Sequence, residues 1–487
     1  MDRTSRKSTG SSFWLALLVV ACVQSVIGLS IWSDGGMAYA QDDDGGDDGG
    51  DDDDGREASG VDNRVGAASR RSGNEGTRSP SRNLQTNGLR RTRVVQAAPP
   101  PEFAAGEIVV TNLSEVDLAA LLVEGFIVIE RIELFDVAVV MHRLRVPDGL
   151  TLEQARDRVR AQPTGATGDF NHYYRTGEDA LSPASGVFSA PVAMAPVANC
   201  AHMNCSALKL IGWPAERDLS PVCRVTVPVG VIDTGVNAAH ENLVGARIEV
   251  LRLLAEDVDP SKAVHGTAIA GLLVGQVPDR TPGLIPEANL VVVDIFGRKG
   301  DDERASVASL IKALDLLAQR KVKVINLSLA GPANAALEAA LLRLTSPGGA
   351  IVLAAVGNGG PAAQVAYPAG YLNVVAVTAV DQRGQVYRRA QRGMHIDLAA
   401  PGVEVWSATS VSGVKPKTGT SFAVPFASAA AAVLASRNPE ATPHALAAQL
   451  RGLVRDMGAQ GADEVFGAGL LALDTLCGPK IPAVPVE

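Results

Sequence analysis

The chain has 487 residues, of which 46% are hydrophobic and only 4% aromatic, with 49 glycines and a formal net charge of −9. This length accommodates a large domain, a smaller one and tails, and the composition favours a closely packed α/β core. Nine aspartates within residues 42–54 account for the net charge, so we expect the folded remainder to be near neutral. No basic patch indicates a nucleic-acid partner, and the charge does not indicate a substrate.

Residues 1–40 have the features of an export signal. Arg3, Arg6 and Lys7 form a positively charged start, an apolar stretch follows, and Ala-Tyr-Ala at 38–40 supplies a small-residue cleavage site. An uncleaved membrane anchor is the alternative, because about twenty residues can just span a bilayer. We therefore expect an exported protein, periplasmic or extracellular, that contacts a membrane only if this segment is not cleaved.

Residues 41–101 are Asp/Gly-rich, then Arg/Ser/Gly-rich, and end in three prolines, so we predict a disordered linker. Residues 102–176 then show a strand–helix–strand–strand–helix–strand pattern. The expected strands are 107–111, 126–130, 137–145 and 170–175, and the expected helices are 114–124 and 151–162. This order is that of a small α+β domain of the ferredoxin-like kind.

Residues 177–204 are rich in Pro, Ala, Ser and Gly and predict a second linker. Cys200, Cys205, Cys223 and Cys477 suggest two disulfides in an exported protein, with three possible pairings. The C-x-H-x-x-C spacing of the first two cysteines leaves a metal site as an alternative, although standard zinc sites use other spacings.

Between residues 205 and 477 apolar strands alternate with helical patterns, and a short tail, 478–487, follows. The alternation predicts a doubly wound, mostly parallel sheet covered by helices on both faces. In such a fold, sites form at the carboxyl ends of the strands. The expected strands are 229–232, 291–296, 322–327, 351–356 and 374–380, and the expected helices are 265–274, 305–319, 333–344, 421–436 and 442–454.

Four short motifs supply chemistry at these strand and helix ends. Asp233 in D-T-G follows the first of these strands, and His265 in H-G-T begins a helix. Asn358 in G-N-G follows another strand, and Ser421 in G-T-S-F-A-V-P begins the last small-residue helix, with Pro425 expected in its first turn. Each has a structural alternative, as a turn residue, a helix-start histidine, a turn amide or an N-cap. An aspartic protease would need a second D-T-G, which the chain lacks.

With these motifs in the order Asp, His, Ser, the chain resembles the subtilases, the subtilisin-like serine proteases, over roughly residues 205–475. The resemblance implies that Ser421 attacks a peptide carbonyl, with His265 as general base and then acid, and that Asp233 holds the imidazole. Asn358 and the backbone N–H of Ser421 would form the oxyanion hole.

The resemblance also implies a set of substrate-binding residues. Ser328, Leu329 and Ala330 would form the edge that pairs with an extended polypeptide, and Gly357 and Thr378 complete the set. Ala330 and Thr378 stand where the family usually has glycine lining the primary pocket. We therefore expect a narrowed pocket that prefers small apolar residues.

Other positions also depart from the family pattern without removing a catalytic role. Ala268 replaces the second histidine of H-G-T-H, Phe422 replaces the methionine after the serine, and Phe426 replaces a histidine. The loop Gln276–Pro282 lacks the usual calcium ligands. We expect no cofactor and no metal site, and the sequence does not support tight calcium binding.

Residues 102–176 resemble, less specifically, the inhibitory propeptide of the same family. The expected protein is an exported serine endopeptidase that acts on polypeptides, is made as a zymogen, and is inhibited by its own propeptide until it cleaves itself within 176–204. Two alternatives stay open. One is a peptide-binding scaffold without activity, against which the complete set of catalytic side chains argues. The other is an esterase or a processing protease with a single partner.

Overall fold

The computed structural model describes residues 99–134, 137–177, 202–214, 221–254, 258–278 and 280–478. All of them belong to one contact unit, Arg93–Glu487. The export signal predicted at 1–40, nearly all of the linkers predicted at 41–101 and 177–204, and all but the first residue of the tail lie outside the described residues. The predictions made for those segments, and the domain bounds, stay predictions.

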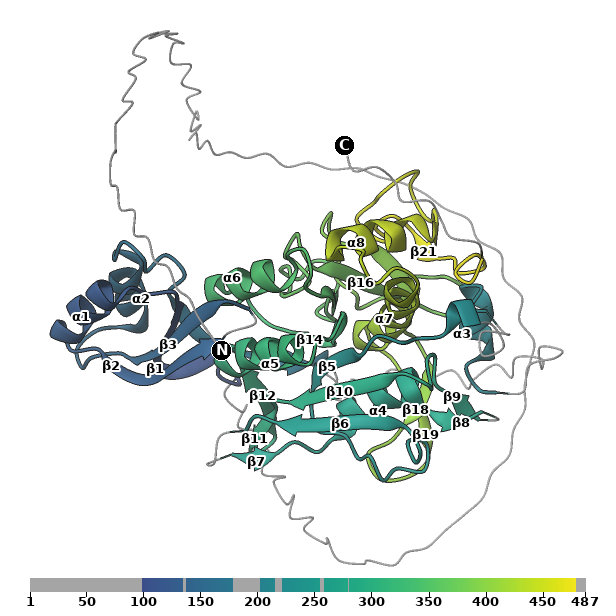
Figure 1. The fold of residues 1–487 in the computed structure, drawn as a ribbon, viewed down its shortest axis with the longest axis horizontal. Helices are drawn as coiled ribbons and strands as arrows, with labels where there is room; N and C mark the ends of the chain where they lie inside the picture. The colour runs from purple at the N-terminus through teal and green to yellow at the C-terminus, as the bar shows by residue number, and fades with distance from the viewer. Residues whose placement is uncertain are drawn as a thin grey trace, which may run out of the picture. The chain divides into compact units, whose positions relative to one another are not determined.

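The N-terminal part has the predicted βαββαβ order. Its elements are β1 (Phe103–Thr111), α1 (Glu115–Val123), β2 (Ile127–Leu134), β3 (Val139–Arg145), α2 (Leu152–Arg160) and β4 (Asp169–Thr176), as seen in Figure 1. The strands pair antiparallel in the order β2-β3-β1-β4. Ser114 caps α1, and Thr151 forms a reciprocal capping box with Gln154 at the start of α2.

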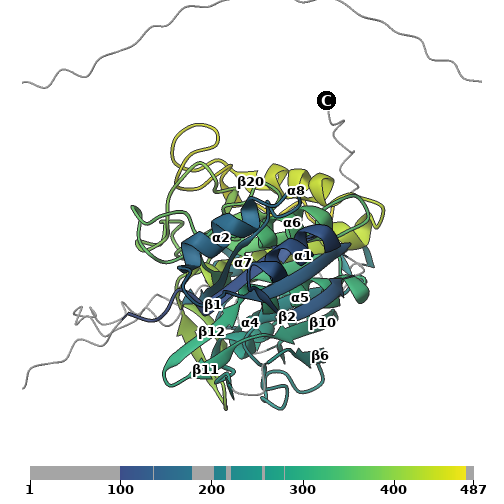
Figure 2. The same ribbon diagram turned by 90° about the vertical axis from the view of Figure 1, so that its left-hand side faces the viewer.

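Successive side chains of β1 pack on opposite faces of this sheet. Ile108 and Val110 share a core with α1 and α2. Val109 instead shares a core with α5 (Val307–Gln319) and α6 (Ala335–Leu344). The N-terminal sheet therefore has α1 and α2 on one face and α5 and α6 on the other (Figure 2).

A nine-stranded sheet forms the centre of the larger, C-terminal part. Its strands are β5 (Val229–Asp233), β6 (Arg247–Arg252), β10 (Asn289–Asp294), β13 (Val324–Leu327), β15 (Ile351–Ala355), β16 (Val375–Val380), β17 (Leu398–Pro401), β20 (Val454–Arg455) and β21 (Leu470–Leu471). Their order is β20-β21-β17-β16-β15-β13-β5-β10-β6, and every pair is parallel except β20 with β21. The predicted doubly wound α/β fold is confirmed.

Helices cover both faces of this sheet, which is why its central strands are mostly apolar and buried. The remaining helices are α3 (Cys205–Leu210), α4 (Val264–Val274), α7 (Thr420–Arg437) and α8 (Pro443–Gly452), and a 3-10 turn spans Pro221–Cys223. They share one core, while α5 and α6 share the core on the opposite face. Within the described ranges, every helix falls short of the length and apolar content that a membrane crossing requires.

The remaining strands are short. They are β7 (Asp259–Pro260), β8 (Gln276–Val277), β9 (Thr281–Pro282), β11 (Gly297–Lys299), β12 (Asp302–Ser306), β14 (Leu329–Ala330), β18 (Val405–Ala408) and β19 (Val414–Lys417). Strands β8 and β9, and strands β18 and β19, form separate two-stranded sheets. Strand β4 pairs with both β12 and β14, so the N-terminal sheet continues into the C-terminal part.

Two details of the predicted helices are wrong. The helix predicted over 305–319 begins at Val307, because Ala305 and Ser306 end β12 and pair with β4. Pro425 lies inside α7 rather than in its first turn, because this helix already begins at Thr420.

A disulfide joins Cys223 to Cys477, residues 254 positions apart in the chain. Cys205 is disulfide-bonded as well, and Cys200 lies outside the described residues. A disulfide-bonded sulfur cannot act as a thiolate ligand, which argues against the alternative of a metal site at the C-x-H-x-x-C sequence.

Candidate active site

Asp233 and His265 meet at the carboxyl end of β5. Asp233 is the last residue of this strand, and His265 lies in the first turn of α4. Nδ1 of His265 is 2.8 and 2.9 Å from the two carboxylate oxygens of Asp233, and both side chains are buried. An acceptor at Nδ1 fixes the ring and favours the tautomer that carries its proton there.

The loop after β5 holds the start of α4 in place. The Thr234 hydroxyl accepts a hydrogen bond of 2.8 Å from the backbone N–H of Gly266. A side chain at Gly266 would clash with the carbonyl oxygen of Thr234, so this close approach requires glycine. The D-T-G and H-G-T motifs are therefore bonded to each other through the Thr234 hydroxyl and the Gly266 backbone as well as through Asp233 and His265.

Ser421 lies in the first turn of α7 and is buried. Its hydroxyl donates to the backbone carbonyl of Ser328 over 3.3 Å. The ring of the next residue, Phe422, packs against the imidazole of His265, with ring centroids 5.4 Å apart. The helices α4 and α7, which pack against each other, thus bring the imidazole and the hydroxyl to one edge of the sheet.

Asn358 follows β15 and points its amide nitrogen at the end of β4. The backbone N–H and the hydroxyl of Thr420 both donate to Oδ1 of Asn358, each over 3.0 Å. Since Oδ1 is occupied, Nδ2 is directed at Gly177, where an added Cβ would clash with it and lie 3.5 Å from Oγ of Ser421. A hydroxyl and an amide donor therefore meet beside Gly177.

The end of β4 lies between two strand edges of the C-terminal part. Its residues 173–174 pair antiparallel with β12, and Arg175 and Thr176 lie opposite Ala330 and Leu329 of β14. An extended segment that pairs with such strand edges is the arrangement in which a polypeptide binds by adding a strand to a sheet. The predicted substrate-binding edge thus pairs with the chain's own strand.

Side chains of β4 fit the same region. Tyr174 is fully buried, and its hydroxyl donates to the carbonyl of Pro332 over 2.7 Å. Arg175 donates to both carboxylate oxygens of Asp302, over 2.9 and 3.1 Å. Burial alone would raise the pKa of Asp302, but the hydrogen bonds and charges of Arg175 and a second arginine outweigh it and lower this pKa. Both side chains therefore have specific partners.

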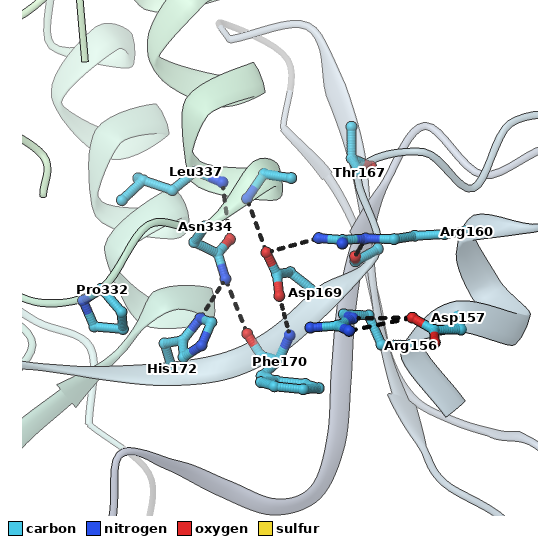
Figure 3. A network of polar contacts seen from close by, with 12 residues as sticks. Arg156, Asp157, Arg160, Thr167, Asp169, Phe170, His172, Pro332, Asn334 and Leu337 are labelled. Atoms are coloured by element: carbon cyan, nitrogen blue, oxygen red, sulfur yellow. Dashed lines mark hydrogen bonds and ion pairs between the residues drawn. The ribbon is translucent and has the colours of Figure 1, made fainter. Parts of the chain in front are cut away.

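Figure 3 shows the polar contacts that join β4 to the start of α6. Asp169 accepts a hydrogen bond of 3.2 Å from the backbone N–H of Ala335, where a carboxylate also complements the helix dipole. Nδ2 of Asn334 donates to the carbonyl of Phe170 over 2.9 Å and lies 3.0 Å from Nδ1 of His172. Burial lowers the pKa of His172, which favours the neutral ring that can accept this bond.

Three further residues of the predicted substrate-binding set are Ser328, Gly357 and Thr378, and their contacts differ. Ser328 contacts Ser421 at two points, because its hydroxyl also donates to the Ser421 carbonyl over 2.9 Å. Gly357 donates its N–H to the Thr420 hydroxyl over 3.2 Å. Thr378 lies in β16, fully buried, and its Oγ1 has no hydrogen-bond partner among the described residues. Its role in a pocket stays a prediction.

The sequence motifs missed a second carboxylate at this edge. Asp294 ends β10, lies opposite Asp233 in the parallel register, and is fully buried with one oxygen 3.2 Å from Nε of Arg252. Burial raises the pKa of Asp294 to about 6, with Arg252 opposing and the charge of Asp233 adding to the rise. The sequence V-V-V-D, which ends at Asp294, has the same pattern as V-G-V-I-D, which ends at Asp233. This repeated pattern of an apolar strand followed by an aspartate was the available sequence signal for Asp294.

No group of three or more His, Cys, Asp or Glu side chains that could hold a metal ion occurs in the part of the chain that the structure describes. The strands β8 and β9 form a hairpin in the loop 276–282. The expectations that the protein needs no cofactor and that this loop does not bind calcium tightly stay predictions.

A hydroxyl, an imidazole held by a carboxylate, and an amide donor at the end of an extended strand can perform acyl transfer at a peptide carbonyl. Residues 225–469 match the Subtilase family, Peptidase_S8, which is half of the chain. Fold, site and match define a serine-type endopeptidase that acts on polypeptides. The chain belongs to the subtilase family.

Individual proteins are also similar to this chain. Subtilisin Savinase of Lederbergia lenta is 33% identical over 247 residues, which are 50% of this chain and 88% of that protein. Subtilisin DY of Bacillus licheniformis is 29% identical over 257 residues, which are 51% and 89% of the two chains. The crystal structure of fervidolysin from Fervidobacterium pennivorans covers 79% of this chain and 63% of its own, with a TM-score of 0.62 and 20% identity. This last likeness concerns the fold, and it extends beyond the residues that match the family.

Proposed function

We propose that the protein is an exported serine endopeptidase made as a zymogen, and that Asp233, His265, Ser421 and Asn358 are its catalytic residues. The observation that carries this proposal is the position of Gly177. An extended segment of the chain ends there, next to the Ser421 hydroxyl and the Asn358 amide, where the scissile bond of a substrate would lie.

The chemistry follows from the geometry of these side chains. Oγ of Ser421 attacks the peptide carbonyl carbon while Nε2 of His265 accepts its proton. Asp233, bonded to Nδ1, stabilises the imidazolium that forms. Nδ2 of Asn358 and the backbone N–H of Ser421 donate to the oxyanion, and this N–H has no acceptor within α7 because it lies in the first turn. His265 then returns the proton to the leaving amine, and water releases the acyl group in the same way.

Strand β4 supports a zymogen in which residues 102–176 inhibit the enzyme. Tyr174 is buried against the Pro332 carbonyl, and Arg175 is bonded to Asp302. Asn171 accepts the N–H of Ala308 at the start of α5, in addition to the contacts with α6. We propose that the enzyme cleaves its own chain after Gly177 and that the N-terminal part then stays bound as an inhibitor.

The same strand supports a substrate class. Pairing of residues 173–174 with β12 and of residues 175–176 with β14 recognises an extended polypeptide, which a small ester could not supply. Because a side chain at Gly177 would clash with Asn358 in this arrangement, we propose that the primary position of a substrate prefers small residues.

Two observations support export to the periplasm or the extracellular space. Residues 1–40 have the composition of a signal peptide. The Cys223–Cys477 disulfide is stable in an oxidising compartment and unusual in a reducing cytosol. We expect the mature enzyme to act without a cofactor.

A fluorophosphonate probe tests the proposed nucleophile, because it reacts only with an activated serine. We expect the active protein to be labelled once per chain at Ser421, and Ser421→Ala to lose both label and peptidase activity. His265→Ala should lose labelling as well, while Asn358→Ala should keep its triad and lower kcat by about 10²–10³-fold, the loss known for subtilisin. Peptidase activity that survives in Ser421→Ala would contradict the proposal.

A further inference from the structure

A proline inside α7 leaves the carbonyl of Ser421 without its helical partner. In an α-helix the carbonyl of residue i accepts the N–H of residue i+4, which for Ser421 is residue 425. Pro425 has no N–H to give. A buried carbonyl without a donor destabilises the folded state by about 1–3 kcal/mol, so a replacement is needed.

The replacement comes from the strand edge rather than from the helix. The hydroxyl of Ser328 donates to the Ser421 carbonyl over 2.9 Å, and both residues are buried. In return, the backbone carbonyl of Ser328 accepts from the hydroxyl of Ser421 over 3.3 Å. A single residue, located between β13 and β14, therefore contacts both the backbone and the side chain of Ser421.

A buried amide fixes the direction of this hydroxyl. Nδ2 of Asn326, in β13, donates to Oγ of Ser328 over 2.8 Å, and Oδ1 of Asn326 accepts from the hydroxyl of Ser428 over 3.3 Å. All three side chains are fully buried. Because its oxygen accepts from Asn326, the Ser328 hydroxyl directs its single proton at the Ser421 carbonyl.

We propose that Ser328, oriented by Asn326, is a positioning residue for the nucleophile. Its hydroxyl replaces the helix amide that Pro425 lacks, and so fixes the backbone from which both Oγ and the oxyanion-binding N–H of Ser421 project. This inference rests on the proposed role of Ser421. Ser328 also precedes β14, so the same residue connects the strand that binds a polypeptide to the serine that attacks it.

The test removes the hydroxyl and then returns a donor from the helix. Ser328→Ala, expressed as the full chain, allowed to mature and measured with active sites counted by fluorophosphonate labelling, should lower kcat about three- to tenfold, as expected for one hydrogen bond. KM should change less than about twofold, because the backbone of β14 is unaltered. Pro425→Ala supplies a new N–H at the position that faces the Ser421 carbonyl. In Ser328→Ala/Pro425→Ala, kcat should therefore return to within about twofold of Pro425→Ala alone.

Ser407 provides a matched control on the other helix of the site. It is also buried, and its hydroxyl donates to a helix carbonyl, that of Ala268 in α4, over 2.6 Å. We expect Ser407→Ala to keep kcat within about twofold. If Ser328→Ala does not fold, Ser328→Cys keeps a similar volume with a weaker donor and should lower kcat in the same direction.

Three results would overturn the inference: an unchanged kcat in Ser328→Ala, or in Ser328→Cys where that variant is needed; an equal loss in Ser407→Ala; or no recovery in the double variant. These outcomes differ from failure of the proposed function, which Ser421→Ala reports separately. If Ser421→Ala is inactive and Ser328→Ala is not impaired, only the positioning role is wrong.

Discussion

At the scale of single residues, the direction of the Asn358 amide decides whether this side chain can stabilise an oxyanion. A backbone N–H can only donate a hydrogen bond. The Asn358 atom that the backbone N–H of Thr420 contacts is therefore the amide oxygen. The amide nitrogen then faces Gly177 and the Ser421 hydroxyl. The G-N-G motif predicts an amide after a strand, but only the Thr420 contact shows which of its atoms faces the site.

Asp294 makes a testable contribution to the pH dependence of folding. Burial raises the pKa of Asp294 from its model-peptide value of 3.8 to about 6. A carboxyl with a raised pKa in the folded state stabilises that state below the unfolded pKa, and this stability is lost as pH rises through the folded pKa. We expect Asp294→Asn to remove this loss, so that its free energy of unfolding increases relative to that of wild type by about 1–3 kcal/mol as the pH rises from 4 to 6.5.

Denaturant unfolding of both proteins, each as its Ser421→Ala variant to prevent self-digestion, measures this difference at each pH. Asp381→Asn is a suitable control, because this aspartate is in a turn and its carboxylate accepts only from the backbone N–H groups of residues 383 and 385 among the contacts described. A difference between Asp294→Asn and wild type that is constant from pH 4 to 6.5 would contradict the assignment.

At the scale of elements, Gly331 permits Tyr174 of β4 to reach its pocket. An added Cβ at Gly331 would lie only 2.6 Å from the ring, near the base of the side chain, where the ring cannot move away easily. We expect Gly331→Ala to displace β4 and slow self-processing by about tenfold or more, since overpacking of this kind destabilises by about 1–3 kcal/mol. The rate at which the full-length band disappears measures this effect.

Gly452→Ala is the matched control, because nothing lies within 4 Å of the added Cβ. It should mature at the wild-type rate, and thermal unfolding should show that both variants fold. If Gly331→Ala matures as fast as Gly452→Ala, the fit of Tyr174 does not govern processing.

The elements that the sequence predicts well are those defined by local signals. The apolar runs that became β5 and β15, and the helix α2 that follows Thr151, depend on neighbouring residues and are close to their predicted positions. Ala305 and Ser306 have helical neighbours, yet they form a strand because β4 pairs with them from 131 or more residues away. Two-residue strands such as β14 carry no periodic signal, so their existence depends on the partner strand.

Active-site prediction follows the same division. Asp233, His265, Ser421 and Asn358 stand in short motifs, and the structure brings them to one sheet edge. Asp294 was missed because its burial and its Asp233 neighbour arise only from the parallel register of β5 and β10. The effect of Pro425 also requires the start of α7 to be known, since a proline leaves the carbonyl four residues before it without a helical donor only where the helix already includes that residue.

At the scale of the whole molecule, the Cys223–Cys477 disulfide links the segment before β5 to the segment after β21. A cross-link over 254 residues removes much conformational entropy from the unfolded chain. We expect Cys223→Ser/Cys477→Ser to lower the free energy of unfolding by about 2–5 kcal/mol. Thermal unfolding with and without reductant measures this, and a double variant as stable as the oxidised wild type would contradict it.

The central claim is that Ser421, activated by His265 and Asp233, cuts the chain's own extended segment after Gly177. N-terminal sequencing and intact mass of the purified mature protein test this most directly, with Ser421→Ala prepared in parallel. The account predicts a mature chain that begins at residue 178 and a variant that stays uncut at this bond. A mature chain that begins elsewhere, or a Ser421→Ala protein cut at the same bond, would contradict it.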